Sequence, residues 1–116
     1  MPDFTIIRGD DRSYALTVKD AAGVAVNLTG LTGDAIQFVA RRRARSEEAV
    51  ITKVEGDGIV ITDGPAGEFR LDILPADTSV LGNWRQAYVF DVQVTVGGKV
   101  LTVARGTLIV EPEIAT

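Results

Sequence analysis

Apolar and polar residues alternate with a period close to two along most of the chain. An extended strand gives this pattern when one of its faces is buried and the other is solvated. The alternating segments are residues 4–6, 14–18, 36–40, 69–73, 88–96 and 101–103. With shorter strands expected at 59–62 and 107–110, the pattern predicts about eight strands, as in small β-sandwiches and barrels.

Turn-forming residues separate these segments. Gly97-Gly98 stands between two alternating runs and predicts a two-residue hairpin. Residues 74–81 do not alternate, and they predict one helical turn that crosses between the sheets. Pro75 has a backbone angle suited to a helix start, and Asp77 can cap the turn locally. Residues 40–49 are interpreted as a strand end that runs into a polar loop.

The pattern favours an all-β fold, an immunoglobulin-like β-sandwich of about eight antiparallel strands with one short helical turn. A single domain is expected to span residues 1–116. Tyr88 is placed to anchor the corner that enters its strand, Phe90 takes the position of the antibody cysteine, and Phe38 is the large core residue of an earlier strand. A barrel of similar strand number would give nearly the same sequence.

Composition excludes several classes of function. The chain has no cysteine and no histidine, so it forms no disulfide, no Cys/His zinc site and no His-based catalytic triad. We therefore expect no enzymatic activity and no cofactor. The N-terminus does not resemble a signal peptide, and no apolar run approaches the length of a membrane span. Synthesis in a cytoplasm is expected.

A cluster of arginines follows the strand at 36–40 and is a candidate interaction site. Nucleic acid is disfavoured because Glu47 and Glu48 lie close by and the net charge is −4. A salt-bridged surface or an acidic partner subunit is the preferred interpretation, since the planar guanidinium pairs well with carboxylates. The cluster consists of Arg41, Arg42, Arg43 and Arg45.

Trp84 is the only tryptophan and follows the predicted helical turn. One interpretation is that Trp84 covers the bottom of the core. The other is that it is partly exposed and anchors a protein contact or stacks on a sugar ring. Arg85 beside it suits either kind of partner, so Trp84 and Arg85 join the candidate interaction residues.

Other short motifs receive structural interpretations. Arg8-Gly9-Asp10, the tripeptide that integrins recognise, ends a predicted strand and is interpreted as a turn. The formal glycosylation triplet Asn27-Leu28-Thr29 is interpreted as a strand-like segment with Leu28 pointing inward. The acidic turns do not match the calcium-binding EF-hand pattern, so their Asp-Gly pairs are assigned to turn formation. The acidic turn residues are Asp57, Asp63 and Glu68, with Asp10 and Asp11 elsewhere.

The order of motifs resembles that of immunoglobulin-like domains in structural proteins of tailed phages, including the N-terminal domain of siphophage baseplate upper proteins. The motifs are Gly9-Asp10 at a strand end, residues 20–30 ending in Asn27-Leu28-Thr29-Gly30, the strand Tyr88–Asp91, and the closing segment 106–110. In the usual form of the second motif an aspartate stands where this chain has Asn27. The resemblance implies assembly and interaction, and it supplies no catalytic residues.

We therefore expect a non-catalytic structural protein of a tailed phage or phage-like particle, in the tail tip, baseplate, neck or capsid surface. Other virion subunits are its expected partners, in a symmetric assembly of several copies without membrane. The strands Phe4–Arg8 and Thr107–Val110 are candidate edges for pairing with a neighbouring subunit, and the tail 111–116 is expected to reach a partner. The alternative is a receptor- or carbohydrate-binding adhesion module.

Overall fold

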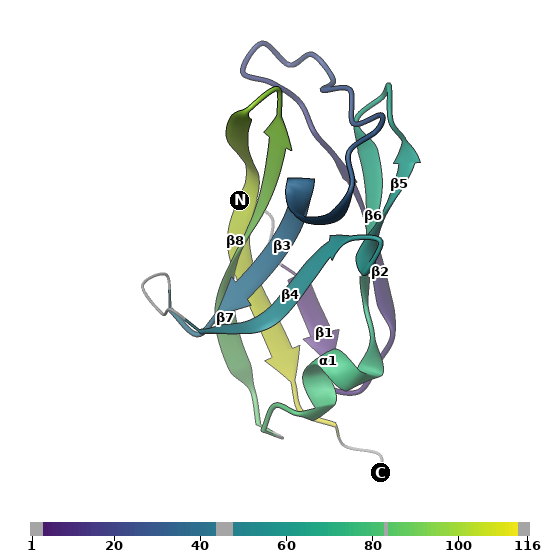
Figure 1. Cartoon of the computed structure of the whole chain (residues 1–116). Helices are drawn as coiled ribbons and strands as arrows, with labels where there is room; N and C mark the ends of the chain where they lie inside the picture. The colour runs from purple at the N-terminus through teal and green to yellow at the C-terminus, as the bar shows by residue number, and fades with distance from the viewer. Residues whose placement is uncertain (1–3, 44–47, 83, 114–116) are drawn as a thin grey trace.

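The computed structural model describes residues 4–43, 48–82 and 84–113, and these residues form eight strands in one hydrogen-bonded sheet. The strand order is β1-β8-β7-β3-β4-β5-β6-β2. In Figure 1, β8, β7 and β3 form one wall, β5, β6 and β2 form the other, and β4 crosses between them. The elements are β1 (Phe4–Ile7), β2 (Arg12–Thr17), the 3-10 turn η1 (Gly33–Ala35), β3 (Ile36–Arg41), β4 (Ala49–Glu55), β5 (Gly58–Asp63), β6 (Glu68–Ile73), α1 (Pro75–Ser79), β7 (Gln86–Val96) and β8 (Lys99–Glu111).

The sequence patterns that predicted most of these elements are confirmed. The Gly97-Gly98 pair connects β7 to β8 in register, with Val96 opposite Lys99. Both glycines have positive φ, as the two-residue hairpin requires. The helical turn forms at Pro75–Ser79, and the backbone N–H of Leu74 donates to the Asp77 carboxylate at 2.7 Å. Neither described helical segment has the length and apolar character needed to cross a membrane.

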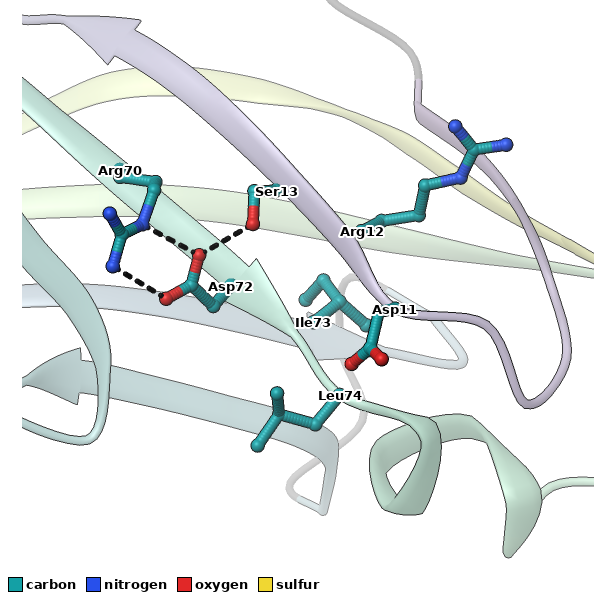
Figure 2. Close-up of a pocket in the computed structure, with 7 residues that line it drawn as sticks. All are labelled: Asp11, Arg12, Ser13, Arg70, Asp72, Ile73 and Leu74. Atoms are coloured by element: carbon teal, nitrogen blue, oxygen red, sulfur yellow. Dashed lines mark hydrogen bonds and ion pairs between the residues drawn. The ribbon is translucent and has the colours of Figure 1, made fainter.

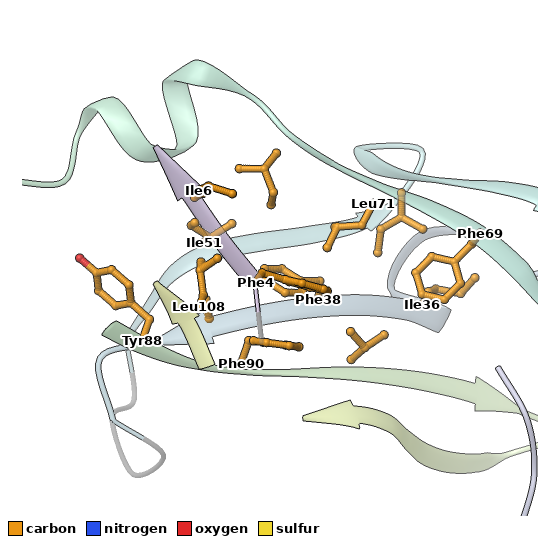
Figure 3. Close-up of a cluster of buried hydrophobic side chains, with 14 of the residues drawn as sticks. Phe4, Ile6, Ile36, Phe38, Ile51, Phe69, Leu71, Tyr88, Phe90 and Leu108 are labelled. Carbon is orange, nitrogen blue, oxygen red and sulfur yellow. The ribbon is translucent and has the colours of Figure 1, made fainter. Parts of the chain in front are cut away.

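The core is formed by the apolar positions of the alternating strands. Along β3 the alternation is regular, with Ile36, Phe38 and Ala40 fully buried between half-buried neighbours. Aromatic rings form a row through the interior, in which Phe4 stacks on Phe90 at 4.9 Å and Phe90 contacts Phe38 at 5.3 Å between ring centroids. Figure 3 shows Phe4, Phe38 and Phe90 together among the buried aliphatic side chains. The prediction that Phe38 and Phe90 belong to the core is confirmed.

The sheet curls until its two edge strands meet, so that it is nearly closed into a barrel. The ring of Phe4 on β1 stacks on the ring of Tyr14 on β2, with centroids 4.2 Å apart and planes 15° apart. Among the described residues no backbone ladder joins these two strands. We call this contact the seam. It is held by side-chain packing and by the chain itself, because only residues 8–11 connect β1 to β2.

Two parallel pairings correct the expectation of an antiparallel arrangement throughout. β1 runs parallel to β8, with Phe4 opposite Leu108, and β4 is parallel to β5 over two residue pairs. The expectation that Thr107–Val110 forms an edge is also wrong, because β7 and β1 pair with the two sides of this segment. The expectation of an edge at Phe4–Arg8 is confirmed for β1, the first strand in the sheet order.

Truncation of Phe4 tests the seam. Phe4→Ala removes a ring that is 8% exposed and contacts both Tyr14 and Phe90, so we expect it to lower the free energy of unfolding. The expected loss is about 3 kcal/mol, as for other buried phenylalanines, measured by urea denaturation. The control Val24→Ala, at a side chain that is 60% exposed, should change stability by less than about 0.5 kcal/mol. A loss below about 1 kcal/mol for Phe4→Ala would show that the seam does not depend on this ring.

Candidate functional site

Helix α1 closes one end of the barrel, and a buried ion pair fixes its position. The Asp77 carboxylate that accepts the Leu74 N–H also lies 2.7 Å from the Nζ of Lys53 on β4. Lys53 is only 5% exposed, and its aliphatic stem passes over Gly58. Asp77 is half-buried, so it is loss of Asp77 that would leave a buried charge, the Lys53 ammonium, uncompensated. The pair therefore holds α1 against β4.

The turn between β1 and β2 is anchored to the same helix. The Arg8 side chain donates to the carbonyl of Ser79, the last residue of the helix, and to that of Leu81, two residues further on, at 2.8 Å. It also pairs with Glu113 near the end of the described chain. The N–H of Gly9 donates to the buried Thr78 hydroxyl at 2.9 Å. Arg8 therefore ties the seam, α1 and the segment after β8 into one structure, which we call the α1 end.

Trp84 lies on the surface of the α1 end. Its side chain is 62% exposed, so the interpretation that it covers the bottom of the core is wrong and the alternative of partial exposure is confirmed. The ring rests on the backbone of Gly82, where an added Cβ would lie 1.9 Å from two ring carbons. The absence of a side chain at Gly82 thus lets the indole lie directly against the backbone. Val80, which caps α1, is 79% exposed on the same end.

A hydrogen-bond network of Tyr88 and Gln86 holds the backbone at Gly82, two residues before Trp84. The buried Tyr88 hydroxyl bonds the Gln86 side-chain oxygen, and the Gln86 amide donates to the carbonyl of Gly82 at 2.7 Å. Tyr88 thus reaches the upstream backbone through Gln86, whereas the expected corner would have a direct bond. The Arg42 guanidinium lies 5.8 Å from the centroid of the Tyr88 ring. Burial raises the pKa of the Tyr88 phenol, and the Arg42 charge opposes this rise.

The structure separates the predicted arginines by environment. Arg85 is exposed beside Trp84 and pairs with Glu111, with its Nε 3.1 Å from the carboxylate. Arg42 and Arg43 are exposed after the end of β3, whereas Arg41 is half-buried and its Nε has no hydrogen-bond partner. Arg45 lies outside the described residues. Trp84 and Arg85 therefore stand together just before β7, and Arg42 lies against Tyr88 of that strand.

The two sequence motifs that resemble recognition signals, Arg8-Gly9-Asp10 and Asn27-Leu28-Thr29, make hydrogen bonds and packing contacts within the fold. Arg8 and Gly9 of the Arg-Gly-Asp tripeptide are held by α1, and the N–H of Asp10 closes the turn on the carbonyl of Ile7 at 3.0 Å. In the glycosylation triplet the Asn27 side chain accepts from the N–H of Thr29 at 2.9 Å, and Leu28 is fully buried. The turn interpretation of the first motif is confirmed. For the second motif the inward position of Leu28 is confirmed, but residues 27–29 do not belong to a strand.

The acidic turns are also explained locally. The Asp63 carboxylate accepts from the N–H of Ala66 at 3.2 Å, which is ordinary turn chemistry. Within residues 4–43, 48–82 and 84–113, no group of three or more acidic, cysteine or histidine side chains is placed to hold a metal ion.

A shallow cavity of about 340 Å³ lies between the ends of β2 and β6, beside Asp11, Arg12 and Leu74 (Figure 2). On its wall Asp72 accepts two hydrogen bonds from Arg70, at 2.9 and 3.2 Å, and one from the Ser13 hydroxyl at 2.7 Å. The Arg70 bonds, and then the Ser13 bond, hold the pKa of Asp72 below its usual value. Of the charged residues that line the cavity, Arg70 and Asp72 are paired with each other, whereas Asp11 and Arg12 have no ion pair among the described residues.

Several contributors to the α1 end were missed in the sequence. Lys53 lies on β4, a strand that the alternation does not predict, so no pattern marks its position. Gln86 lies two residues before Tyr88, in line with the inward positions of the run 88–96, and a polar residue at such a position is the signal that could have identified it. Val80 could have been noticed as an apolar residue at the end of a short polar helix. No sequence signal shows that Glu113 would pair with Arg8, since they are 105 residues apart in the chain.

Comparison with known proteins finds similarity among solved structures. No protein-family model matches the chain, and no curated protein matches it significantly. Among solved structures, the N-terminal domain of phage TP901-1 ORF48 is similar, with 17% sequence identity and a TM-score of 0.48. The match covers 95% of this chain and 85% of that chain. A superposition this loose does not establish a common function.

The pKa of Asp72 predicts how its contribution to stability depends on pH. Because the folded-state pKa is below the unfolded value, the folded protein holds the proton less tightly. Asp72 therefore stabilises the fold above about pH 4, and this contribution is lost as the pH falls through the folded-state pKa. We expect Asp72→Asn to be less stable than wild type at neutral pH and the difference to shrink in acid, as measured by urea denaturation at several pH values.

The variant Ser13→Ala is the control, because it removes the smaller of the two hydrogen-bond contributions to the shift. It should change stability in the same direction and by less. An equal difference between wild type and Asp72→Asn at neutral and acidic pH would contradict the prediction.

Proposed function

We propose that the chain is a non-catalytic structural protein of a tailed phage or phage-like particle, which packs against other virion subunits through the α1 end. The observation that carries the proposal is the exposed indole of Trp84, which lies against Gly82 and is 62% exposed. A large aromatic ring at the surface offers a large apolar contact area together with an N–H donor, and tryptophan is frequent in the energetic centres of interfaces.

The surroundings of Trp84 fit a protein partner. Val80 adds a second exposed apolar side chain, and Ile7, at the end of β1 beside Arg8, is 42% exposed. The Arg85–Glu111 and Arg8–Glu113 pairs place charges of both signs beside these residues. An apolar centre with a polar rim is the usual composition of a protein interface. The exposed Arg42 and Arg43 add positive charge, which favours an acidic partner surface.

The phage assignment is supported by the resemblance of the sequence motifs to those of immunoglobulin-like domains in tailed-phage structural proteins, which act in assembly. The strand pairing of the sheet supports an immunoglobulin-like arrangement. The orders β2-β6-β5 and β8-β7-β3-β4 match the B-E-D and G-F-C-C′ orders of immunoglobulin-like sheets. The absence of histidine and cysteine from the sequence supports a packing function, because the common nucleophile–base pairs cannot be formed.

Purified particles test the proposal directly. Phage-like particles are induced from the strain that encodes the chain, purified by density gradient, and analysed by quantitative mass spectrometry. We expect peptides of the chain at a fixed ratio to a major structural protein in every preparation. Absence of the chain from intact particles would overturn the proposal.

Substitution of Trp84 tests the α1 end as the contact surface. In a strain that lacks the native gene, we expect Trp84→Ala to reduce incorporation into particles by at least about tenfold, as for other interface centres. The matched control is Val60→Ala, at a side chain 41% exposed on β5. It should be incorporated normally. Equal incorporation of both variants would assign the contact to another surface.

The exposed indole also supports a second function, a carbohydrate-binding adhesion module, because sugar rings stack on exposed tryptophan. A glycan array with the wild-type chain and Trp84→Ala distinguishes the two functions. Under the structural proposal we expect no saturable binding. Saturable binding that is lost in Trp84→Ala would favour the adhesion module.

A further inference from the structure

We propose that the first half of β8, Lys99–Arg105, is a strand-addition site that takes an extended, acidic segment of a partner subunit. The proposal rests on the assembly function proposed above and names a second contact for it, away from the α1 end. It is based on the pairing of β8 in the sheet, on the charges along its free edge, and on the bulge within it.

Only part of β8 has a neighbour on each side. β7 pairs with β8 along its whole length, from Lys99 to Val110. On the other side β1 pairs only with Leu108–Glu111. No described residue pairs with Lys99–Arg105 on that side, so its outward backbone N–H and C=O groups are available to another strand. An edge of this kind is a template for strand addition.

The side chains of this free edge suit an added strand. Val100 is 61% exposed, Leu101 is half-buried, and Val103 is half-buried against the core, so an incoming strand would find apolar contacts. β1 already occupies the continuation of the same edge, with Phe4 opposite Leu108. A partner strand that follows the line of β1 would therefore extend an existing row of the sheet.

Charge determines which kind of strand fits. The charged residues of the segment are Lys99 and Arg105, which are both exposed, and neither has an ion-pair partner among the described residues. If two copies of this edge paired with each other, the only charges that could meet would be positive, whatever the register. Like charges opposite each other destabilise cross-strand pairs. Carboxylates on the incoming strand would instead find a positive charge at each end of the site. The occupant is therefore an acidic segment of a different chain.

A β-bulge limits the contact to a short segment. Val92 pairs with Ala104 and the next residue, Gln93, pairs with Thr102, so Val103 is an extra residue in β8. Bulges increase the local twist and are a common device against unlimited edge-to-edge pairing. The edge is thus open to one short strand but poorly suited to growing into a larger sheet with copies of itself.

The test uses the full chain labelled with ¹⁵N and three short synthetic peptides, followed by amide chemical shifts in NMR titrations. The first peptide alternates valine and threonine and carries glutamate near both ends. The second replaces each glutamate with lysine. The third keeps the glutamates but is N-methylated at alternate residues, which removes backbone donors without changing the charge.

We expect the acidic peptide to shift amides of residues 99–105 in a saturable way. The lysine peptide should bind at least about tenfold more weakly, because its positive charges would lie opposite Lys99 and Arg105. The N-methylated peptide should not bind. No binding of the acidic peptide, equal binding of the acidic and lysine peptides, or shifts confined to the α1 end would each overturn the proposal. If the amide shifts of residues 99–105 changed with the concentration of the chain alone, without peptide, the acidic partner would be wrong and the occupant would be a second copy of this chain.

Particle incorporation separates this proposal from the one on which it rests. The variant Lys99→Glu/Arg105→Glu reverses both charges of the free edge and should be incorporated at least about tenfold less than wild type. The control Arg12→Glu/Lys19→Glu makes the same change in net charge at two exposed residues outside β8. Normal incorporation of both variants would overturn the edge proposal alone. Absence of the wild-type chain from particles would overturn the assembly function itself.

Discussion

Strands β1 and β2 stand at opposite ends of the sheet order, yet only residues 8–11 separate them in the chain. The sheet must therefore curl until its two edges meet, and the other features of the fold follow from this closure. Phe4 and Tyr14 stack across the seam, and the aromatic row continues through Phe90 to Phe38 on the far wall. Burial of these rings stabilises the closure in place of a backbone ladder.

The closure also builds the α1 end. Because the turn between β1 and β2 crosses the seam, Arg8 and Gly9 reach the last residues of α1 and hold them in place. Lys53 fixes the start of the same helix through Asp77. The segment that leaves α1 is thereby positioned so that Trp84 rests on Gly82 at the surface. The exposed indole is a consequence of the same contacts that close the barrel.

Much of the strand content could be predicted, because a half-buried strand imposes a period of two on its own residues. The positions of Phe38 and Phe90 in the core followed from the same pattern. The edge assigned to Thr107–Val110 was wrong for a physical reason. Whether a strand is an edge depends on which other strand lies beside it, and the parallel pairing of β1 with β8 joins residues about a hundred positions apart.

The sequence by itself determined most local features, namely the strands other than β4, the Gly97-Gly98 hairpin, the short helix at Pro75 and many inward-facing residues, although it divided β8 into two segments. Each of these depends on backbone preferences and on neighbours within a few residues. Only the tertiary structure decided that β1 covers the β8 edge at Leu108–Glu111 and that Arg8 pairs with Glu113. It also decided that Trp84 faces solvent. These outcomes depend on how distant segments pack, and the exposure of a residue is a property of that packing.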